Sequence, residues 1–262
     1  MQLPILSSLS ELFSKVTEDF KSLFQAWSLV AAGLFLFLNL LLVYPLARGI
    51  QAVKAFEGLD KFIQVAVATF ALFLFGYLVN SLSSFFVALA GGQAFRGSLI
   101  DGMMRRGQRR RYDRLKSRLD PVTHDQPDIN RAAYRLAYEL PREDYIRSTR
   151  LGNVHAAVAD YSANQYGAHL DTVWPVLEAA LVKDEDKLLE KIGAEQTSMT
   201  FLCALSGLLV FTAFTAVPAR LFLGRPLWAE LLILSALLVV GYVTYRAAVG
   251  RAAAWARLVR TA

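Results

Sequence analysis

Four apolar blocks dominate the pattern of hydrophobic and polar positions along the chain. They cover residues 27–47, 63–90, 199–218 and 228–249, and each is almost free of charged side chains. A helix needs about 20 predominantly apolar residues to cross the hydrocarbon core of a bilayer, and every block reaches that length. The pattern therefore predicts four transmembrane helices.

The blocks stand in two pairs on either side of a long polar segment. The predicted fold class is all-α: a four-helix transmembrane protein with a mostly helical cytoplasmic domain inserted between spans 2 and 3. Before span 1, apolar residues recur at spacings of three and four, which predicts an amphipathic helix. The predicted parts are this helix at 1–26, spans 1 and 2 within 27–92, a basic cytoplasmic domain at 93–197, spans 3 and 4 within 198–249, and a cytoplasmic tail at 250–262.

The polar segment contains several expected helices. Residues 131–140 fit either a helix or a short strand. A helix is expected from about Arg150 to Tyr166 and ends before Gly167, a residue that favours the left-handed conformation after a helix. Pro175 is expected in the first turn of the next helix, and a charged helix at 183–195 leads into span 3.

Basic residues set the expected orientation in the membrane. The two termini and the central segment together hold 23 Lys and Arg residues, whereas the two short connections hold 5. Because cytoplasmic segments are enriched in Lys and Arg, both termini and the central domain are expected in the cytoplasm of a multi-pass bacterial inner-membrane protein. Aromatic residues near the span ends are expected to anchor the spans at the two interfaces: Trp27, Tyr44, Trp228, Tyr242 and Tyr245.

The second apolar block, predicted as one long helix, carries small and polar residues four positions apart: Gly76, Asn80, Ser84, Ala88 and Gly92. Small residues let helices approach closely, and polar residues hydrogen-bond across helices. Two interpretations remain open, a close-packing face inside one subunit and a pore wall or subunit interface in an oligomer. Asn39 in the first block is a candidate partner for Asn80. The candidate pore or interface residues are Asn39, Gly76, Asn80, Ser84 and Ala88.

A run of basic residues follows the second block. One interpretation is a solvated helix next to the membrane that meets anionic lipid headgroups. The other is a site for a phosphorylated signal such as a nucleotide or oligonucleotide, because the arginine fork makes paired hydrogen bonds to phosphate. The candidate anion or signal-binding residues are Arg105, Arg106, Arg109, Arg110, Arg111, Arg114, Arg118, Arg150 and Asn153.

The sequence TRLGNV at 149–154 is followed by YG at 166–167 and WP at 174–175. This arrangement resembles a segment of uncharacterised bacterial polytopic membrane proteins that carry TRLGN, YG and WP between paired spans. The resemblance implies a similar layout over most of the chain and no particular activity. That family continues with Leu-Arg-Ala-Ala after LGNV, whereas this chain has His155 followed by two alanines.

The residues give no sign of an active site or a metal site. The chain has no phosphate-binding P-loop, no HExxH motif and no Gly-x-Ser-x-Gly motif, and its single cysteine, Cys203, lies within the third block. The span centres hold no ionisable residue of the kind that proton pumps and ion-coupled transporters use. We therefore expect a protein that is not an enzyme and needs no cofactor or metal.

The expected function is an oligomeric inner-membrane channel or pore-type effector, gated through its cytoplasmic domain. By analogy of layout alone, such a protein suits bacterial antiphage defence, in which a nucleotide-type signal triggers a membrane effector. The alternative is a membrane scaffold or adaptor without a channel, which recruits a cytoplasmic protein partner. The expected partners are the lipid bilayer, further copies of this chain, and either the nucleotide or oligonucleotide signal or the protein partner.

Overall fold

The computed structural model describes residues 26–47, 50–121, 124–184, 186–221 and 226–262. Every regular element in these ranges is a helix, which confirms the all-α prediction. The amphipathic helix predicted at 1–26 lies outside the described residues except for its last position. The chain divides into two compact units, called unit 1 and unit 2 below. Unit 1 comprises Met1–Ser83 and Gly207–Gly241, and unit 2 comprises Ser84–Ser206 and Tyr242–Ala262.

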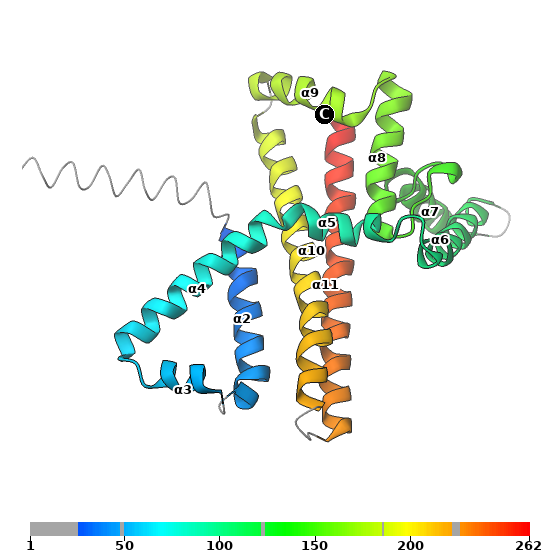
Figure 1. Cartoon of the computed structure of the whole chain (residues 1–262). Coiled ribbons are helices and arrows are strands. Elements are labelled where there is room, and N and C mark those ends of the chain that lie inside the picture. The colour runs from blue at the N-terminus through cyan, green and yellow to red at the C-terminus, as the bar shows by residue number, and fades with distance from the viewer. Residues whose placement is uncertain (1–25, 48–49, 122–123, 185, 222–225) are drawn as a thin grey trace, which may run out of the picture. The chain divides into compact units, whose positions relative to one another are not determined.

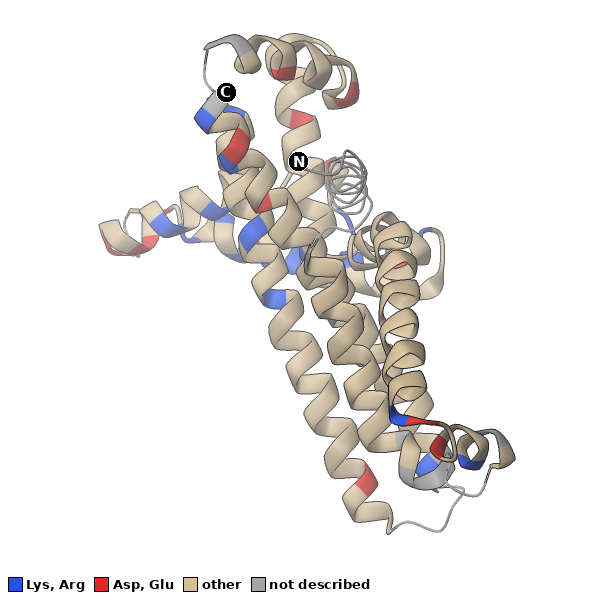
Figure 2. Ribbon diagram, turned by 90° about the vertical axis from the view of Figure 1, so that its left-hand side faces the viewer, with Lys and Arg blue, Asp and Glu red and all other residues tan. Residues whose placement is uncertain are grey.

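The apolar blocks form long helices. Three described helices are long and apolar enough to cross a membrane: α4 (Lys61–Ser81), α10 (Asp186–Leu221) and α11 (Leu227–Thr261). Figure 2 shows the long uncharged stretches of these helices. The first block forms α2 (Ala26–Ala47), whose apolar part is shorter, and α3 (Gln51–Glu57) follows it. These lengths and compositions fit a protein embedded in a membrane.

The second apolar block is not one helix, so that prediction is wrong. Helix α4 ends at Ser81, Leu82 forms a turn, and α5 covers Ser83–Ala90. The break falls where Asn80, Ser81, Ser83 and Ser84 follow one another closely, and such side chains compete with the helix for backbone hydrogen bonds. The boundary between unit 1 and unit 2 falls at the same place.

In unit 1, helix α2 packs against α4 (Figure 1). The two helices approach closely where Leu29 faces Gly76, because a Cβ at Gly76 would lie 2.6 Å from Leu29 Cδ2. The ring of Phe35 on α2 packs against Phe75 of α4 at 5.9 Å and against Phe211 of α10 at 6.2 Å between centroids. Apolar contacts thus join α2 to both neighbours.

One arginine joins three helix ends of unit 1. The Nε of Arg220, near the end of α10, donates to both carboxylate oxygens of Glu230 in the first turn of α11, each at 2.9 Å. Its Nη1 donates to the carbonyl of Leu42, near the end of α2, at 3.1 Å. Glu230 is only 1% exposed, so this ion pair is shielded from water.

Unit 2 is a series of short helices completed by parts of α10 and α11. After α5 come η1 (Gln93–Phe95), α6 (Leu99–Ser117), α7 (Gln126–Glu139), η2 (Glu143–Tyr145), α8 (Arg150–Tyr166) and α9 (Leu170–Asp184). Helix α6 packs on α7, α7 on α8, and α8 on α9 (Figure 1). Leu115, Ala132 and Leu140 form a small apolar core that includes parts of α6 and α7.

The helices of the polar segment agree with the sequence predictions in part. Helix α8 has the predicted bounds, and Gly167 after it has a φ of 65°, in the left-handed region. Residues 131–139 are helical within α7, so the strand alternative is wrong. Pro175 lies inside α9 rather than in its first turn, since α9 begins at Leu170.

The two last helices are longer than the apolar blocks within them. The charged segment at 183–195 and the third block belong largely to one continuous helix, α10. The residues predicted as a tail at 250–262 continue α11 almost to the end of the chain. The apolar stretch of α10 is thus preceded by a polar helical extension, and that of α11 is followed by one.

Candidate functional site

The candidate pore residues lie on three helices, and Asn39 is on α2. Gly76 and Asn80 lie on α4, whereas Ser84 and Ala88 lie on α5. Gly92 follows α5 with a φ of 79° and is not helical. The small and polar residues spaced four apart from Gly76 to Gly92 therefore do not form one continuous helix face, because the helix is interrupted at Leu82.

Two members of this set make contacts within the chain. Gly76 is buried and packs on Leu29. The side-chain amide of Asn39 donates to the carbonyl of Phe35 at 2.9 Å and to the hydroxyl of Thr212 at 3.4 Å. These partners of Asn39 belong to α2 and α10, and the candidate pairing of Asn39 with Asn80 is not among them. Asn80 is partly buried, Ala88 is partly buried, and Ser84 is exposed.

The basic run forms most of α6, and its arginines fall into two groups. Arg105 binds the carboxylate of Asp101 through Nε at 3.2 Å and Nη2 at 2.9 Å, and Arg111 forms an ion pair with Glu139 of α7. The others are exposed and have no carboxylate partner among the described residues: Arg106, Arg109, Arg110, Arg114 and Arg118. The exposed group is the part of the predicted set that is accessible to an anion.

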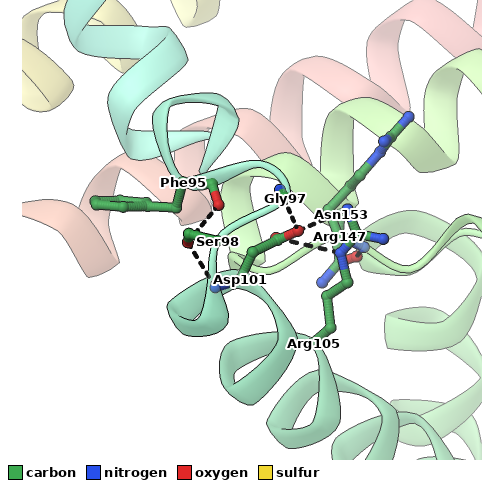
Figure 3. A network of polar contacts seen from close by, with 7 residues as sticks. All are labelled: Phe95, Gly97, Ser98, Asp101, Arg105, Arg147 and Asn153. Atoms are coloured by element: carbon green, nitrogen blue, oxygen red, sulfur yellow. Dashed lines mark hydrogen bonds and ion pairs between the residues drawn. The ribbon is translucent and has the colours of Figure 1, made fainter.

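Asp101 organises the start of α6 (Figure 3). The hydroxyl of Ser98 accepts a hydrogen bond from the backbone N–H of Asp101 at 3.2 Å, and the Asp101 carboxylate accepts one from Gly97 N–H at 3.2 Å. Burial disfavours its charged form, but hydrogen bonds from Gly97, Arg105 and Ser148 outweigh burial and lower the pKa of Asp101. The spacing of Ser98 and Asp101 is that of a capping box, a signal that predicts this helix start.

The TRLGN motif builds the start of α8. Thr149 caps the helix, since its hydroxyl accepts from Gly152 N–H at 3.0 Å. The fully buried Asn153 accepts from Arg147 N–H at 2.6 Å and donates to the side chain of Gln108 at 3.3 Å. Both ends of the Asn153 amide are therefore occupied by protein groups, which favours a packing role over the predicted anion contact.

The two glycines after α5 lie against this motif. A Cβ at Gly152 would overlap the carbonyl oxygen of Gly91, and a Cβ at Gly92 would overlap the hydroxyl of Ser148. Gly92 also needs its left-handed backbone conformation, which other residues rarely adopt. We call this close approach the glycine contact. It holds the segment that leaves α5 on the start of α8.

A cavity of about 340 Å³ lies beside the glycine contact, and we call it the arginine cavity. Its charged groups are Arg150 on α8 and Arg246 on α11. Burial, followed by the nearby positive charges of Arg111 and Arg246, lowers the pKa of Arg150. The cavity lining comprises Leu89, Ala90, Met104, Gln108, Ser148, Thr149, Arg150, Tyr242, Tyr245 and Arg246.

The sequence pointed to only one of the two cavity arginines. Arg150 was in the candidate set, whereas Arg246 was not, because it lies on a different helix far along the chain. Tyr242 and Tyr245 were expected as interfacial anchors. The hydroxyl of Tyr242 accepts from Arg246 Nη1 at 3.3 Å, and that of Tyr245 accepts from Leu151 N–H at 3.4 Å.

A second cavity, of about 390 Å³, lies near the end of α11. Arg260 lines it and donates to the backbone carbonyls of Ala137 on α7 and Ala157 on α8, the latter at 2.7 Å. Its guanidinium also lies over the rings of Tyr138 and Tyr161. Through these contacts the guanidinium joins α11 to α7 and α8, so Arg260 has a structural role.

Comparison with known proteins finds no match: no protein-family model matches the chain, and no curated protein or solved structure does so. The function therefore has to be inferred from the residues of the chain itself.

Proposed function

We propose that this chain is a multi-pass protein of the bacterial inner membrane in which α2, α4, α10 and α11 cross the bilayer. The apolar lengths of the helices support this arrangement. The Arg220 contacts also support it, because they bring together the end of α2, the end of α10 and the start of α11. These ends lead into the connections that are poor in basic residues, which suits the outer side of the membrane, with both termini and most of unit 2 in the cytoplasm.

We further propose that the protein is an oligomeric channel or pore-type effector gated through its cytoplasmic domain. The observation that carries this proposal is the glycine contact, which holds the chain leaving α5 on the start of α8. Since α5 follows α4 after a single turn residue, a rearrangement of α8 would act on the chain that continues from α4. Coupling of this kind needs a packed element with two discrete arrangements.

The exposed arginines of α6 are the proposed receiving surface for a phosphorylated, nucleotide-type signal of antiphage defence. Their forks suit phosphate, and their charges are not compensated by carboxylates among the described residues. The exposed apolar face of α4 suits contact with lipid or with further subunits, since Phe62, Val65 and Phe70 are 80%, 65% and 69% exposed. Ser84 on α5 is then the most accessible candidate for a pore wall.

Ion flux from liposomes tests the channel directly. Liposomes that contain the purified protein are compared with empty ones, with and without cyclic dinucleotides and short oligonucleotides. The proposal predicts flux above the empty liposomes in at least one condition. Flux equal to that of empty liposomes in all conditions would contradict it.

The second candidate function is a membrane scaffold or adaptor that recruits a cytoplasmic protein. It is favoured by the contacts of Gly76 and Asn39, which are satisfied inside one subunit and do not require a pore. One stoichiometric partner recovered from cells with the intact protein, together with a lack of flux, would favour this function over the channel.

A further inference from the structure

We propose that the arginine cavity of unit 2 binds a phosphate group, held between Arg150 and Arg246. This binding site does not depend on channel activity. It also differs from the proposed signal surface, which consists of the exposed arginines of α6.

The first argument is the set of groups that meet in the cavity. Two guanidinium groups come from helices far apart in the sequence, α8 and α11, and line the same space of about 340 Å³. Neutral donors complete the lining: the hydroxyl of Tyr242 and the side-chain amide of Gln108. A few polar groups that converge in one cavity are typical of a binding site.

The helix N-terminus of α8 is not what makes this a site. The N–H groups of Leu151 and Gly152 already donate to the hydroxyls of Tyr245 and Thr149. The binding groups are therefore the side chains that line the cavity, above all the two arginines.

The second argument is uncompensated charge. Neither Arg150 nor Arg246 forms an ion pair with a carboxylate of the described residues, in contrast to Arg105 and Arg111 of α6. The carboxylate that raises the pKa of Arg150 belongs to Glu139. This carboxylate already forms an ion pair with Arg111, and its Oε1 lies 3.9 Å from Arg135 Nε. Arg150 is partly buried and Arg246 is exposed, and the positive charge of Arg246 acts on Arg150. An anion between the two arginines relieves this repulsion.

The third argument is the match between the donors and the ligand. Arginine presents several N–H groups in a rigid plane, which fits the oxygens of a phosphate. A tetrahedral phosphate can accept from two forks on different sides at once. The Tyr242 hydroxyl and the Gln108 amide in the lining fit its remaining oxygens or the group esterified to it.

The phosphate can come from an anionic phospholipid or from a soluble molecule, and the position of the cavity favours the lipid. Arg246 and Tyr242 belong to α11, a candidate membrane span, and follow its long apolar stretch. Leu89, Ala90 and Met104 give the cavity an apolar side. Basic pockets beside spanning helices on the cytoplasmic side are known to hold anionic lipid headgroups.

Binding to the intact protein tests this inference. Phosphatidylglycerol in detergent is titrated against the full-length protein and its binding is measured by native mass spectrometry, with phosphatidylcholine as the uncharged comparison. Arg150→Gln and Arg246→Gln are each expected to weaken binding at least about tenfold, the effect of losing charge-assisted hydrogen bonds. Arg131→Gln removes the same charge from an exposed position of α7 outside the cavity lining and is expected to stay within about twofold of wild type, since its loss affects only a screened surface charge.

A second arm uses inorganic pyrophosphate and ADP in place of the lipid. If these bind and phosphatidylglycerol does not, with the same losses in the two cavity variants, the phosphate site stands and its source is soluble. Arg150→Lys and Arg246→Lys keep the charge without the fork, so they preserve folding if the Gln variants do not. They are expected to bind more weakly than wild type. Equal binding by wild type and all cavity variants, or an equal loss in Arg131→Gln, would overturn the proposal, whatever the flux measurements give.

Discussion

Gly152 at the start of α8 lies directly against the carbonyl oxygen of Gly91, the residue that follows α5. No side chain fits between them, so the two backbone segments touch. This contact is the closest link between the TRLGN motif and the chain that leaves the apolar helices. It gives the glycine of the motif a physical reason, namely the close approach of another backbone.

Gly152→Ala is therefore expected to destabilise the protein by about 1–3 kcal/mol, the usual range for a side chain forced into packed space. Thermal unfolding of the purified protein in detergent measures this loss. The matched control is Gly102→Ala on α6, where nothing lies within 4 Å of the added carbon. That change is expected to be neutral or to stabilise by up to about 1 kcal/mol, because alanine is the better helix former. Equal effects of the two substitutions would contradict the packing explanation.

The buried ion pair of unit 1 gives a second prediction. Glu230→Gln leaves the guanidinium of Arg220 without its carboxylate in a shielded position, at an expected cost of about 3–5 kcal/mol. The double variant Arg220→Leu with Glu230→Leu removes both charges and is expected to be less destabilised than the sum of Arg220→Leu and Glu230→Leu made singly. Thermal unfolding of wild type, these two single variants and the double variant gives the coupling energy, and a coupling near zero would show that the pair does not hold these helix ends.

His155 gives a prediction on pH. Its ring lies 5.6 Å from that of Trp255, its Nε2 is 3.5 Å from the sulfur of Met199, and burial lowers the pKa of His155. The folded protein thus favours the neutral ring, whereas the unfolded chain takes up a proton near pH 6.5. Stability is therefore present above about pH 6.5 and is lost as the pH falls below it.

The melting temperature between pH 7.5 and pH 5.5 measures this effect. The melting temperature of His155→Gln is expected to fall less over this range than that of wild type, because the variant has no ring to protonate. His169→Gln, at an exposed position, is the control and is expected to follow wild type. An unchanged slope in His155→Gln would assign the pH dependence to other groups.

The proposed topology can be tested with single cysteines. The natural Cys203 is only 1% exposed, so it adds little background to labelling. Two exposed positions suit an introduced cysteine. Gly58→Cys places it between α3 and α4, and Ser117→Cys places it at the end of α6. A maleimide that cannot cross membranes is expected to label position 58 in intact spheroplasts and position 117 only after lysis. The reverse pattern would contradict the assigned orientation.

The sequence predicted the parts of the fold that depend on local composition. Apolar length identified the long helices, and the bounds of α8 followed from Gly167, whose positive φ ends the helix. The break at Leu82 was missed, because the apolar run continues through it and only the clustered Asn and Ser residues mark it. The start of α9 was also missed, since Pro175 is tolerated inside that helix.

The candidate site was harder to predict because it depends on contacts between distant segments. The spacing of arginines identified α6, yet it could not show that Asp101 and Glu139 already bind two of them. Asn153 was expected to contact an anion, but its partners are Arg147 and Gln108. Arg246 joins Arg150 only through the packing of unit 2, which no local pattern reveals.

The most direct test of the central claim is ion flux measured on variants that separate a pore from simple packing. Ser84→Leu fills an exposed position of the proposed pore wall, and Val67→Leu changes an exposed apolar position of α4. We expect flux through the wild type and Val67→Leu and a loss of at least about tenfold in Ser84→Leu, as a hydrophobic constriction closes a pore. Equal flux through all three proteins, or none above empty liposomes, would contradict it.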